Sequence, residues 1–187
     1  MCLLRPPMTC SFPWVCRSRR SATFVPVSFA LIALGSNQGQ PLKQLAEAQR
    51  HITRRIGRIV KASSIYQTAA WGLEDQPDFL NQVLLVETPY PPLFVLKTAL
   101  EIERHMGRRR IQKWGPRSID LDLILFDQVI LDHPELTLPH PHMAERAFVL
   151  IPASEVAPNW RHPLTQKSLR ELLKQCPDPL SVRKLAL

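Results

Sequence analysis

The chain lacks several features that define common protein classes. No apolar run reaches the roughly 18 residues that span a bilayer, so we expect a soluble protein with no membrane contacts. Three of the four cysteines, Cys2, Cys10 and Cys16, lie near the N-terminus and only Cys176 lies elsewhere, so no disulfide framework can hold the body together. Their spacings fit no common zinc pattern. We therefore expect a reducing compartment, with the cytoplasm as the location.

Acidic residues are absent from the start of the chain up to Glu47. Residues 1–28 contain four prolines and show no periodic apolar face, so we exclude them from the fold. Three alternatives stay open for them: a mitochondrial transit peptide, a disordered extension and a wrongly assigned start codon. We expect one domain over residues 29–176 and a C-terminal tail over residues 177–187. Deletion of residues 1–28 is expected to leave stability and activity nearly unchanged.

Aromatic residues make up only 7% of the chain, although its formal charge is +8. A basic protein can bind nucleic acid, but RNA-binding sheets carry exposed aromatic residues, and no such strand is visible here. Half of the net positive charge corresponds to the four arginines of residues 1–28. Some of the rest is concentrated between Arg108 and Arg117, as expected for a polyphosphate pocket. We expect no nucleic-acid partner and keep an RNA-binding module as an alternative.

Apolar periodicity and turn residues predict alternating strands and helices. In order, we expect strands over residues 29–34, 59–66, 79–88 and 119–126, with helices over 41–56 and 91–106 between them. A brief helix around 145–150 and a helix from 165 to 175, capped by Thr165, follow. This β-α-β-β-α-β order predicts a ferredoxin-like α+β sandwich with a mainly antiparallel sheet and extra C-terminal helices. The 187 residues, 45% of them hydrophobic, supply the core of one domain.

Two carboxylates share one face of the strand expected over residues 119–126. Side chains alternate along a strand, so Asp120 and Asp122 point to one side, with Cα atoms about 6 to 7 Å apart. The apolar residues expected on the other side are Ile119, Leu121, Leu123 and Leu125. Magnesium takes one or two carboxylates and completes its shell with water and phosphate oxygens, so the pair predicts a magnesium site. The alternative is a strand whose acids face solvent and pair with arginines.

Basic residues lie just before this strand: Arg108, Arg109, Arg110, Lys113 and Arg117. Arginine can bind phosphate oxygens through two nitrogens and lysine acts as a point charge, so the segment suits a polyphosphate. A solvated basic loop is the alternative.

Phe79 and Asn81 lie on one face of the strand expected over residues 79–88. A ring beside an amide can stack on a flat heterocycle and hydrogen-bond it, while an edge aromatic beside a loop-anchoring asparagine is the alternative. His140 is either a polar contact to a nucleotide or a turn histidine. His140 and His142 lack the cysteine neighbours of a zinc site.

A turn with Gly35, Ser36, Asn37 and Gly39 joins the first strand to a helix that begins at Pro41. The N–H groups of a helix N-terminus can bind phosphate. This turn matches neither of the common phosphate-binding fingerprints, so it is either a phosphate cradle or an ordinary connection.

Four separated stretches together resemble one family, the 6-hydroxymethyl-7,8-dihydropterin pyrophosphokinases of folate biosynthesis. The stretches are ALGSNQG (33–39), SSIYQTAAWGLEDQPDFLNQV (63–83), KWGPRSIDLDLILF (113–126) and LPHPHMAERAFVL (138–150). The resemblance implies a ferredoxin-like fold and transfer of the pyrophosphoryl group of ATP to the pterin hydroxymethyl oxygen, with release of AMP. It further implies ATP as co-substrate and two magnesium ions. We expect a monomer whose partners are these two small-molecule substrates.

The resemblance also implies roles for individual residues. For the pterin it implies contacts from Thr68, Ala70, Trp71, Phe79, Asn81 and Phe148. For ATP it implies contacts from Glu103, Arg110, Trp114, Thr137, His140 and Arg146. It implies catalytic roles for Arg108, Arg117, Asp120 and Asp122, with both aspartates as metal ligands.

Three departures accompany the resemblance. Ala70 stands where the family commonly has proline. The arginine loop differs in length among relatives, so the roles of Arg109, Arg110 and Gln112 depend on its register. The N-terminal residues match nothing in the family. A nucleotidyltransferase, which would release pyrophosphate, is the alternative enzyme class.

Overall fold

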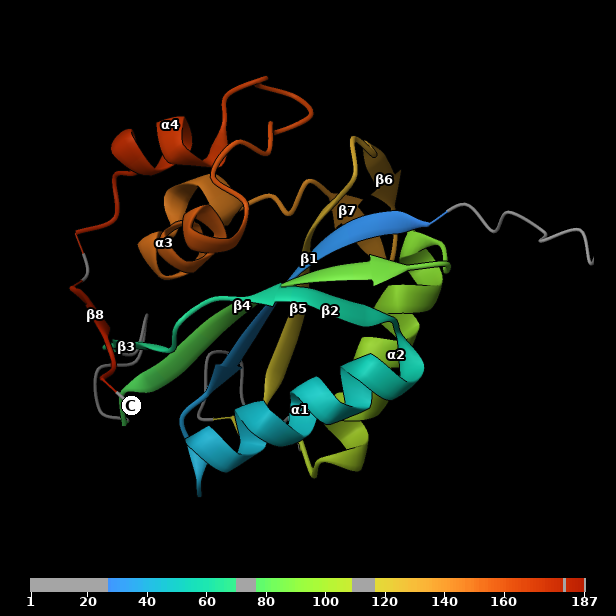
Figure 1. The fold of residues 1–187 in the computed structure, drawn as a ribbon, viewed down its shortest axis with the longest axis vertical. Helices are drawn as coiled ribbons and strands as arrows, with labels where there is room; N and C mark the ends of the chain where they lie inside the picture. Colours follow the sequence, from blue (N-terminus) through green and yellow to red (C-terminus); the bar gives the residue numbers. More distant parts are fainter. Residues whose placement is uncertain (1–26, 70–76, 109–116, 180, 187) are drawn as a thin grey trace, which may run out of the picture.

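The computed structural model describes residues 27–69, 77–108, 117–179 and 181–186 (Figure 1). The strands are β1 (Ser28–Ser36), β2 (Arg58–Ala62), β3 (Tyr66–Thr68), β4 (Phe79–Thr88), β5 (Asp120–Phe126), β6 (Leu131–His133), β7 (Leu136–Leu138) and β8 (Val182–Lys184). The helices are α1 (Pro41–Arg55), α2 (Pro92–His105), the 3-10 turn η1 (Met143–Glu145), α3 (Ala147–Val156) and α4 (Leu169–Lys174).

The main sheet runs in the order β5, β1, β4, β3, β8, and β2 also pairs with β4. Its pairs are antiparallel, with β1 between β4 and β5. Strands β6 and β7 form a separate antiparallel pair. The expectation of a mixed helical and antiparallel-sheet protein is confirmed.

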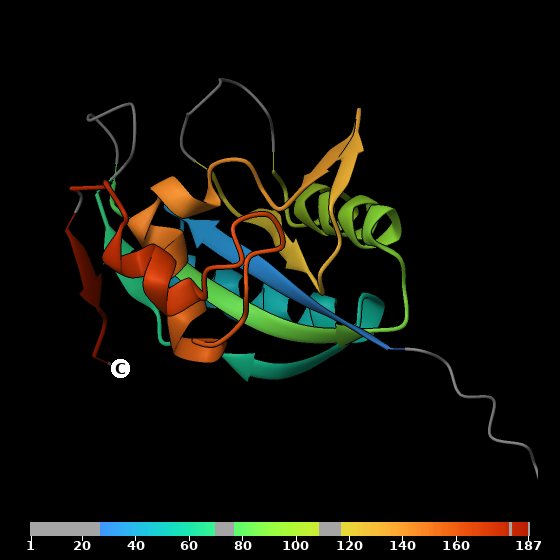
Figure 2. The ribbon, with the colours of Figure 1, turned by 90° about the horizontal axis from the view of Figure 1, so that it is seen from above.

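Helices cover both faces of this sheet. Figures 1 and 2 show α1 and α2 on one face and α3 and α4 on the other. Alternation along β1 supplies both cores: Ile32 and Leu34 pack toward α1 and α2, and Leu31 packs toward α3 and α4. Helix α1 begins with Pro41 in its first turn, where the missing N–H has no helical partner to lose.

The alternation expected along β5 is correct up to Leu123 and wrong at Leu125. Leu121 and Leu123 belong to the core beneath α1 and α2, as predicted, but Leu125 belongs to the opposite core. The cause is a bulge: Ile32 pairs with Leu123 and Leu31 pairs with Leu125, so Ile124 is an extra residue in the strand. A bulge breaks the period of two, and residues beyond it change face.

Other expected boundaries also differ from the structure. The strand expected over residues 59–66 is divided in two, because β2 ends at Ala62 and β3 begins at Tyr66 and runs on to Thr68, where a loop was expected. The segment beyond Cys176 supplies β8, which pairs with β3. The helix expected over residues 145–150 extends through Val156.

The cap of α4 is Ser168 and not Thr165. The Ser168 hydroxyl accepts a hydrogen bond from the Glu171 N–H, and the Glu171 carboxylate accepts one from the Ser168 N–H, which is a capping box. Helix α4 therefore starts three residues later than the proposed Thr165 cap would place it.

Among the described residues, no helix combines the length and the apolar character needed to cross a membrane. Cys176, the one cysteine in the described ranges, is a free thiol.

Candidate active site

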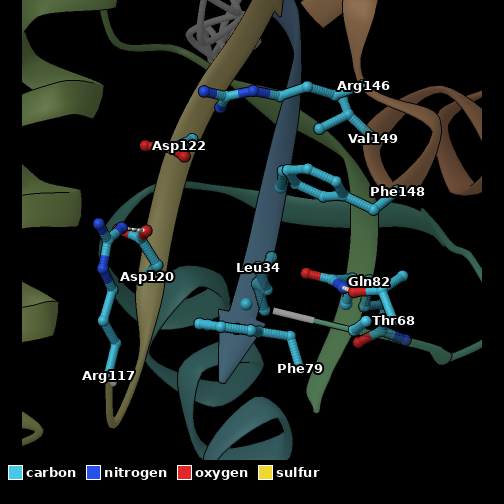
Figure 3. Close-up of a pocket in the computed structure, with 14 residues that line it drawn as sticks. Leu34, Thr68, Phe79, Gln82, Arg117, Asp120, Asp122, Arg146, Phe148 and Val149 are labelled. Atoms are coloured by element: carbon cyan, nitrogen blue, oxygen red, sulfur yellow. Dashed lines mark hydrogen bonds and ion pairs between the residues drawn. The ribbon is translucent and has the colours of Figure 1, made fainter. Parts of the chain in front are cut away.

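A pocket opens where β1, β4 and β5 emerge from beneath α3 (Figure 3). Eight of the residues proposed from the sequence line it: Thr68, Phe79, Asn81, Arg117, Asp120, Asp122, Arg146 and Phe148. They come from five separate places in the chain. The structure therefore brings together most of the expected pterin residues and the paired acids in one cavity.

Strand register explains why these residues meet. Gly35 in the central strand pairs with Asn81 of β4 on one side and with Asp120 of β5 on the other. Paired residues point to the same face, so the amide of Asn81 and the carboxylate of Asp120 flank Gly35. A Cβ atom on Gly35 would lie 3.3 Å from Asn81 Oδ1. Gly35 thus forms a low floor between the two halves of the pocket.

One half of the pocket is aromatic and amide-bearing. In Figure 3, Phe79 of β4 and Phe148 of α3 both project into it. The Asn81 side-chain N–H donates to the Thr68 hydroxyl at 2.8 Å, which fixes the amide so that Oδ1 faces Gly35. Asn81 is 6% exposed and Thr68 is 3% exposed, so this hydrogen bond is shielded from water. Rings and a fixed amide can hold a flat, polar-edged heterocycle.

The other half carries the paired acids. Arg108 Nη1 lies 2.7 Å from Asp120 Oδ1, and the Arg117 guanidinium binds the second carboxylate oxygen, Oδ2. Burial and then the charge of Asp120 raise the pKa of Asp122 to about 6, against the effect of nearby arginines. Two acids therefore share a site where their joint ionisation is unfavourable without added positive charge.

Glu103 lies behind this half, in helix α2, and is not among the residues that line the pocket. It is 2% exposed, accepts a 2.7 Å hydrogen bond from the Leu121 N–H and pairs with the Arg108 guanidinium. Burial, and then the charge of Asp120, raise the pKa of Glu103 to about 7. Its contacts suit a residue that holds Arg108 against Asp120.

Arg146, just before α3, links the two halves. Its guanidinium carbon lies 5.7 Å from the centroid of the Phe148 ring, and Figure 3 shows the side chain reaching toward Asp122. Such a cation beside a ring face and near carboxylates is placed to meet an anionic group entering the pocket.

Two further expected ATP residues lie outside the lining. The His140 N–H donates to the Ile124 carbonyl at 2.9 Å, and burial, followed by the charge of Arg146, lowers the pKa of His140 to about 4, so the ring is neutral at pH 7. Thr137 is exposed on β7. Ala70, Trp71, Arg110 and Trp114, like Arg109, Gln112 and Lys113, lie outside the described residues.

The sequence interpretation gave Gly35 and Asn37 no individual role. Both were noted as part of a turn that is either a phosphate cradle or an ordinary connection, yet Gly35 lines the pocket and Asn37 bonds to residues beside it. Asn37 is 3% exposed, and its side chain bonds to the backbone of Pro77 and of Arg117. In the sequence these residues appear only as the stretch GSN at the end of a strand. That stretch does not reveal the hydrogen-bond partners of Asn37, which are 40 and 80 residues away.

The last feature of the site is its set of possible metal ligands. Within the ranges that the structure describes, no group of three or more histidine, cysteine, aspartate or glutamate residues could hold a metal ion. The paired aspartates are therefore the candidate ligands, and a cation there would need oxygens from water or substrate.

Solved structures with the same fold include HPPK-DHPS chains. One such structure, determined in complex with substrates, matches with a TM-score of 0.64 at 14% identity, over 80% of this chain and 43% of that chain. A Plasmodium falciparum HPPK-DHPS matches with a TM-score of 0.62 at 15% identity, over 80% of this chain and 43% of that chain. The chain thus spans less than half of these solved proteins, and the likeness shows the fold.

Sequence identity is higher to two other relatives than to these solved structures. A 2-amino-4-hydroxy-6-hydroxymethyldihydropteridine pyrophosphokinase of Pseudomonas aeruginosa is 42% identical over 147 residues, which cover 78% of this chain and 90% of that protein. The protein of the same name from Haemophilus influenzae is 39% identical over 150 residues, which cover 80% and 93%. The family profile described as 7,8-dihydro-6-hydroxymethylpterin-pyrophosphokinase (HPPK) matches residues 31–158, a range that begins in β1 and ends just after α3. With the pocket inside that range, the chain belongs to the 7,8-dihydro-6-hydroxymethylpterin-pyrophosphokinase family.

Proposed function

We propose that this chain transfers the β,γ-pyrophosphoryl group of ATP to the hydroxymethyl oxygen of 6-hydroxymethyl-7,8-dihydropterin. The hydroxyl oxygen attacks the β-phosphorus, the bond from that phosphorus to the oxygen bridging to the α-phosphate breaks, and AMP leaves with that oxygen. The hydroxyl proton passes to solvent water in the same reaction. The products are AMP and the pterin diphosphate.

The observation that carries this proposal is the register across β4, β1 and β5. It sets Asn81 and Asp120 on either side of Gly35, so a heterocycle held by the Asn81 half would direct a short side arm toward the acids. Phe79 and Phe148 are the rings proposed to hold the pterin faces, with Asn81 and Thr68 at its polar edge. Transfer between two bound substrates depends mainly on such positioning.

The charges around the acids support a triphosphate as the second substrate. Arg108 and Arg117 are both bound to Asp120. A guanidinium group binds phosphate oxygens in the same geometry in which it binds carboxylate oxygens. These two arginines are therefore placed to release Asp120 and bind ATP oxygens instead. Arg146 is proposed to act on the nucleotide from the Phe148 side, and His140 and Thr137 are proposed as further nucleotide contacts. Glu103 is proposed to hold Arg108 rather than to touch ATP.

Magnesium fits the donor set, and we propose that Asp120 and Asp122 hold two ions. Two neighbouring carboxylates, one with its pKa raised to about 6, supply hard oxygen ligands whose repulsion a cation would relieve. When bound, magnesium would neutralise charge on the triphosphate. The protein side chains do the remaining work by orienting the pterin and excluding water from its faces.

Four broader proposals accompany the reaction. We propose a ferredoxin-like arrangement with α3 and α4 as additions, supported by the antiparallel order β5, β1, β4. Residues 29–176 would form the pyrophosphokinase domain, with residues 1–28 outside it, although strand pairing supports adding Ser28 and β8 to the folded unit. We also propose a monomer, and the free Cys176 is compatible with a reducing, cytoplasmic location.

The nucleotide released is the measurement that tests the reaction. Full-length protein would be mixed with ATP, magnesium and 6-hydroxymethyl-7,8-dihydropterin, and the products would be separated by chromatography. Equal amounts of AMP and pterin diphosphate are expected, with none after chelation of magnesium by EDTA. Release of pyrophosphate would instead indicate a nucleotidyltransferase, release of ADP a single-phosphoryl kinase, and absence of turnover would overturn the proposal.

A further inference from the structure

Asn37 makes a set of hydrogen bonds that join two sides of the pocket. Its side-chain Oδ1 accepts from the Arg117 N–H at 2.8 Å, and its own N–H donates to the Arg117 carbonyl at 3.1 Å. Its side-chain Nδ2 donates to the Pro77 carbonyl at 3.1 Å. The residue is 3% exposed, so these bonds are protected from water. One side chain therefore fixes backbone atoms from two distant segments.

The two tethered residues stand next to groups that the proposed reaction needs. Arg117 binds Asp120 through its guanidinium, and the position of the Arg117 backbone determines where that guanidinium can reach. Pro77 lies two residues before Phe79, whose ring enters the pocket. A shift of either backbone would therefore move a side chain of the site.

A conventional role for Asn37 does not account for these contacts. Asparagine before a helix often caps its N-terminus, but the N-cap of α1 is Gln40, and α1 has no side-chain cap. Gly35 and Asp120 are the last paired residues of β1 and β5. Asn37 lies just beyond Gly35, so its hydrogen bonds extend the link between these two strands past the end of their pairing. The Ser36 hydroxyl, which donates to the Ser118 carbonyl at 2.5 Å, reinforces the same link.

We infer that Asn37 is a positioning residue that couples the arginine side of the site to its pterin side, an inference that rests on the proposed function. Its Oδ1 holds Arg117 against Asp120, and its Nδ2 holds the chain that leads to Phe79. The two atoms have separate effects. Loss of the Oδ1 contact impairs turnover, and loss of the Nδ2 contact weakens pterin binding.

Two substitutions separate these effects. Asn37→Ala removes both side-chain contacts, and we expect kcat/KM to fall about 10- to 100-fold, the range expected when reacting groups are displaced by up to about 1 Å. Asn37→Asp keeps an oxygen for the Arg117 N–H and loses the donor to Pro77. Its KM for the dihydropterin should rise about tenfold while kcat stays within about threefold of the wild type, since only the pterin side is released.

Thr88→Val is the matched control. Thr88 is also fully buried and donates through its side chain to a distant backbone carbonyl, that of Ile56 at 2.7 Å, but it pairs with Ser28 at the opposite end of β1. It should lose stability without a change in kcat or KM. Amide hydrogen exchange at Arg117 adds a readout that does not need turnover, and Asn37→Ala should lose protection there while Thr88→Val keeps it.

The outcomes are distinct. A fall in kcat/KM with loss of Arg117 protection in Asn37→Ala, but not in Thr88→Val, supports the inference. Wild-type kinetic constants in folded Asn37→Ala overturn it, and so does a loss of turnover in Asn37→Asp equal to that in Asn37→Ala. If Asn37→Ala does not fold, the split between KM and kcat in Asn37→Asp decides the matter. An inactive wild type overturns the proposed function instead, and the exchange data then judge the Asn37 contacts alone.

Discussion

The Asn81 side-chain N–H donates a 2.8 Å hydrogen bond to the Thr68 hydroxyl in the buried half of the pocket. The bond leaves the orientation of the amide fixed before a ligand arrives. A fixed amide can discriminate by hydrogen bonding, because an analogue without the matching group leaves a buried polar atom unpaired. Recognition of the heterocycle should therefore depend on this pair more than recognition of the nucleotide does.

Asn81→Ala should weaken dihydropterin binding by about 10- to 100-fold, the loss expected for one or two buried hydrogen bonds. Binding of an ATP analogue should change little, since the acids and arginines remain. Titration calorimetry with each ligand separately measures both effects. Ser63→Ala is the matched control, because Ser63 is also buried and accepts from the Val83 N–H of β4 without lining the pocket. A larger loss for the nucleotide than for the pterin would contradict the assignment.

Asp122→Asn tests the proposed metal site through stability as well as activity. Turnover should fall at least about 100-fold because an electrostatic contact of the transition state is lost. The folded-state pKa of Asp122, about 6, is above the ordinary value of 3.8, so the protonated carboxyl favours folding. That stabilisation is fully present below about pH 4 and is lost as the pH rises through about 6.

Without metal, the variant should therefore be more stable than the wild type at pH 7.5, by on the order of 1 to 3 kcal/mol, and the difference should vanish near pH 4. Urea unfolding at the two pH values measures this. Asp132→Asn, at an exposed site on β6 and outside the pocket lining, is the control and should leave turnover unchanged. Addition of magnesium and a non-hydrolysable ATP analogue should stabilise the wild type more than Asp122→Asn, and equal stabilisation would remove Asp122 from the metal site.

Arg108 provides a test that separates folding from catalysis. Arg108→Met leaves Glu103 buried without its cation, which for a buried pair costs roughly 3 to 5 kcal/mol of unfolding free energy. The double variant Arg108→Met with Glu103→Gln removes the unpaired charge and keeps an oxygen for the Leu121 N–H. It should recover most of that stability.

Activity should not recover with it, because the Arg108 guanidinium is no longer there to meet the phosphates. We expect kcat/KM for ATP to stay about 100-fold low in both variants, a typical effect of losing a charged group that acts on transferred phosphate. Arg58→Met, which breaks the surface pair of Arg58 on β2 with Glu87 on β4, is the control and should be nearly silent. Recovery of activity together with stability would show that Arg108 serves only to neutralise Glu103.

Sequence pattern was sufficient for the parts of the site that follow local alternation. The shared face of Asp120 and Asp122, and that of Phe79 and Asn81, were predictable because a strand repeats every two residues. Leu125 was placed on the wrong face because the bulge at Ile124 arises from pairing with β1, which no single strand reveals. The short strands β3 and β8 were not predicted for the same reason. Each contains three residues and is held by pairing with a strand distant in sequence.

The two missed residues show the limit in another way. Gly35 and Asn37 carry no chemistry that a motif would flag, and their importance depends on what the fold sets beside them. The Arg117 N–H that meets Asn37 is 80 residues away. From the sequence, long-range contacts of this kind could be inferred only through the family resemblance. The stretch ALGSNQG is part of that resemblance, but no role was assigned to Gly35 or Asn37 from it.

Gly35 and Gly57 offer a paired prediction in which the same substitution has opposite consequences. A Cβ on Gly57 would lie 2.1 Å from the Glu87 carbonyl oxygen, a backbone atom that cannot move aside cheaply. Gly57→Ala should therefore cost about 1 to 3 kcal/mol or more in unfolding free energy, as overpacking does, without changing KM in the folded fraction. A Cβ on Gly35 would meet the Asn81 Oδ1 at 3.3 Å, which a small side-chain shift relieves.

Gly35→Ala should consequently fold with little loss of stability, but its methyl group would stand on the pocket floor between Asn81 and Asp120. We expect the KM for the dihydropterin to rise about tenfold or more, since one misplaced methylene-sized group in a shaped site is worth about 1 to 3 kcal/mol. Thermal unfolding and steady-state kinetics of the two variants, measured side by side, give four values. If Gly35→Ala loses stability but keeps its KM, the floor between the strands is structural, and the pterin must lie elsewhere in the pocket.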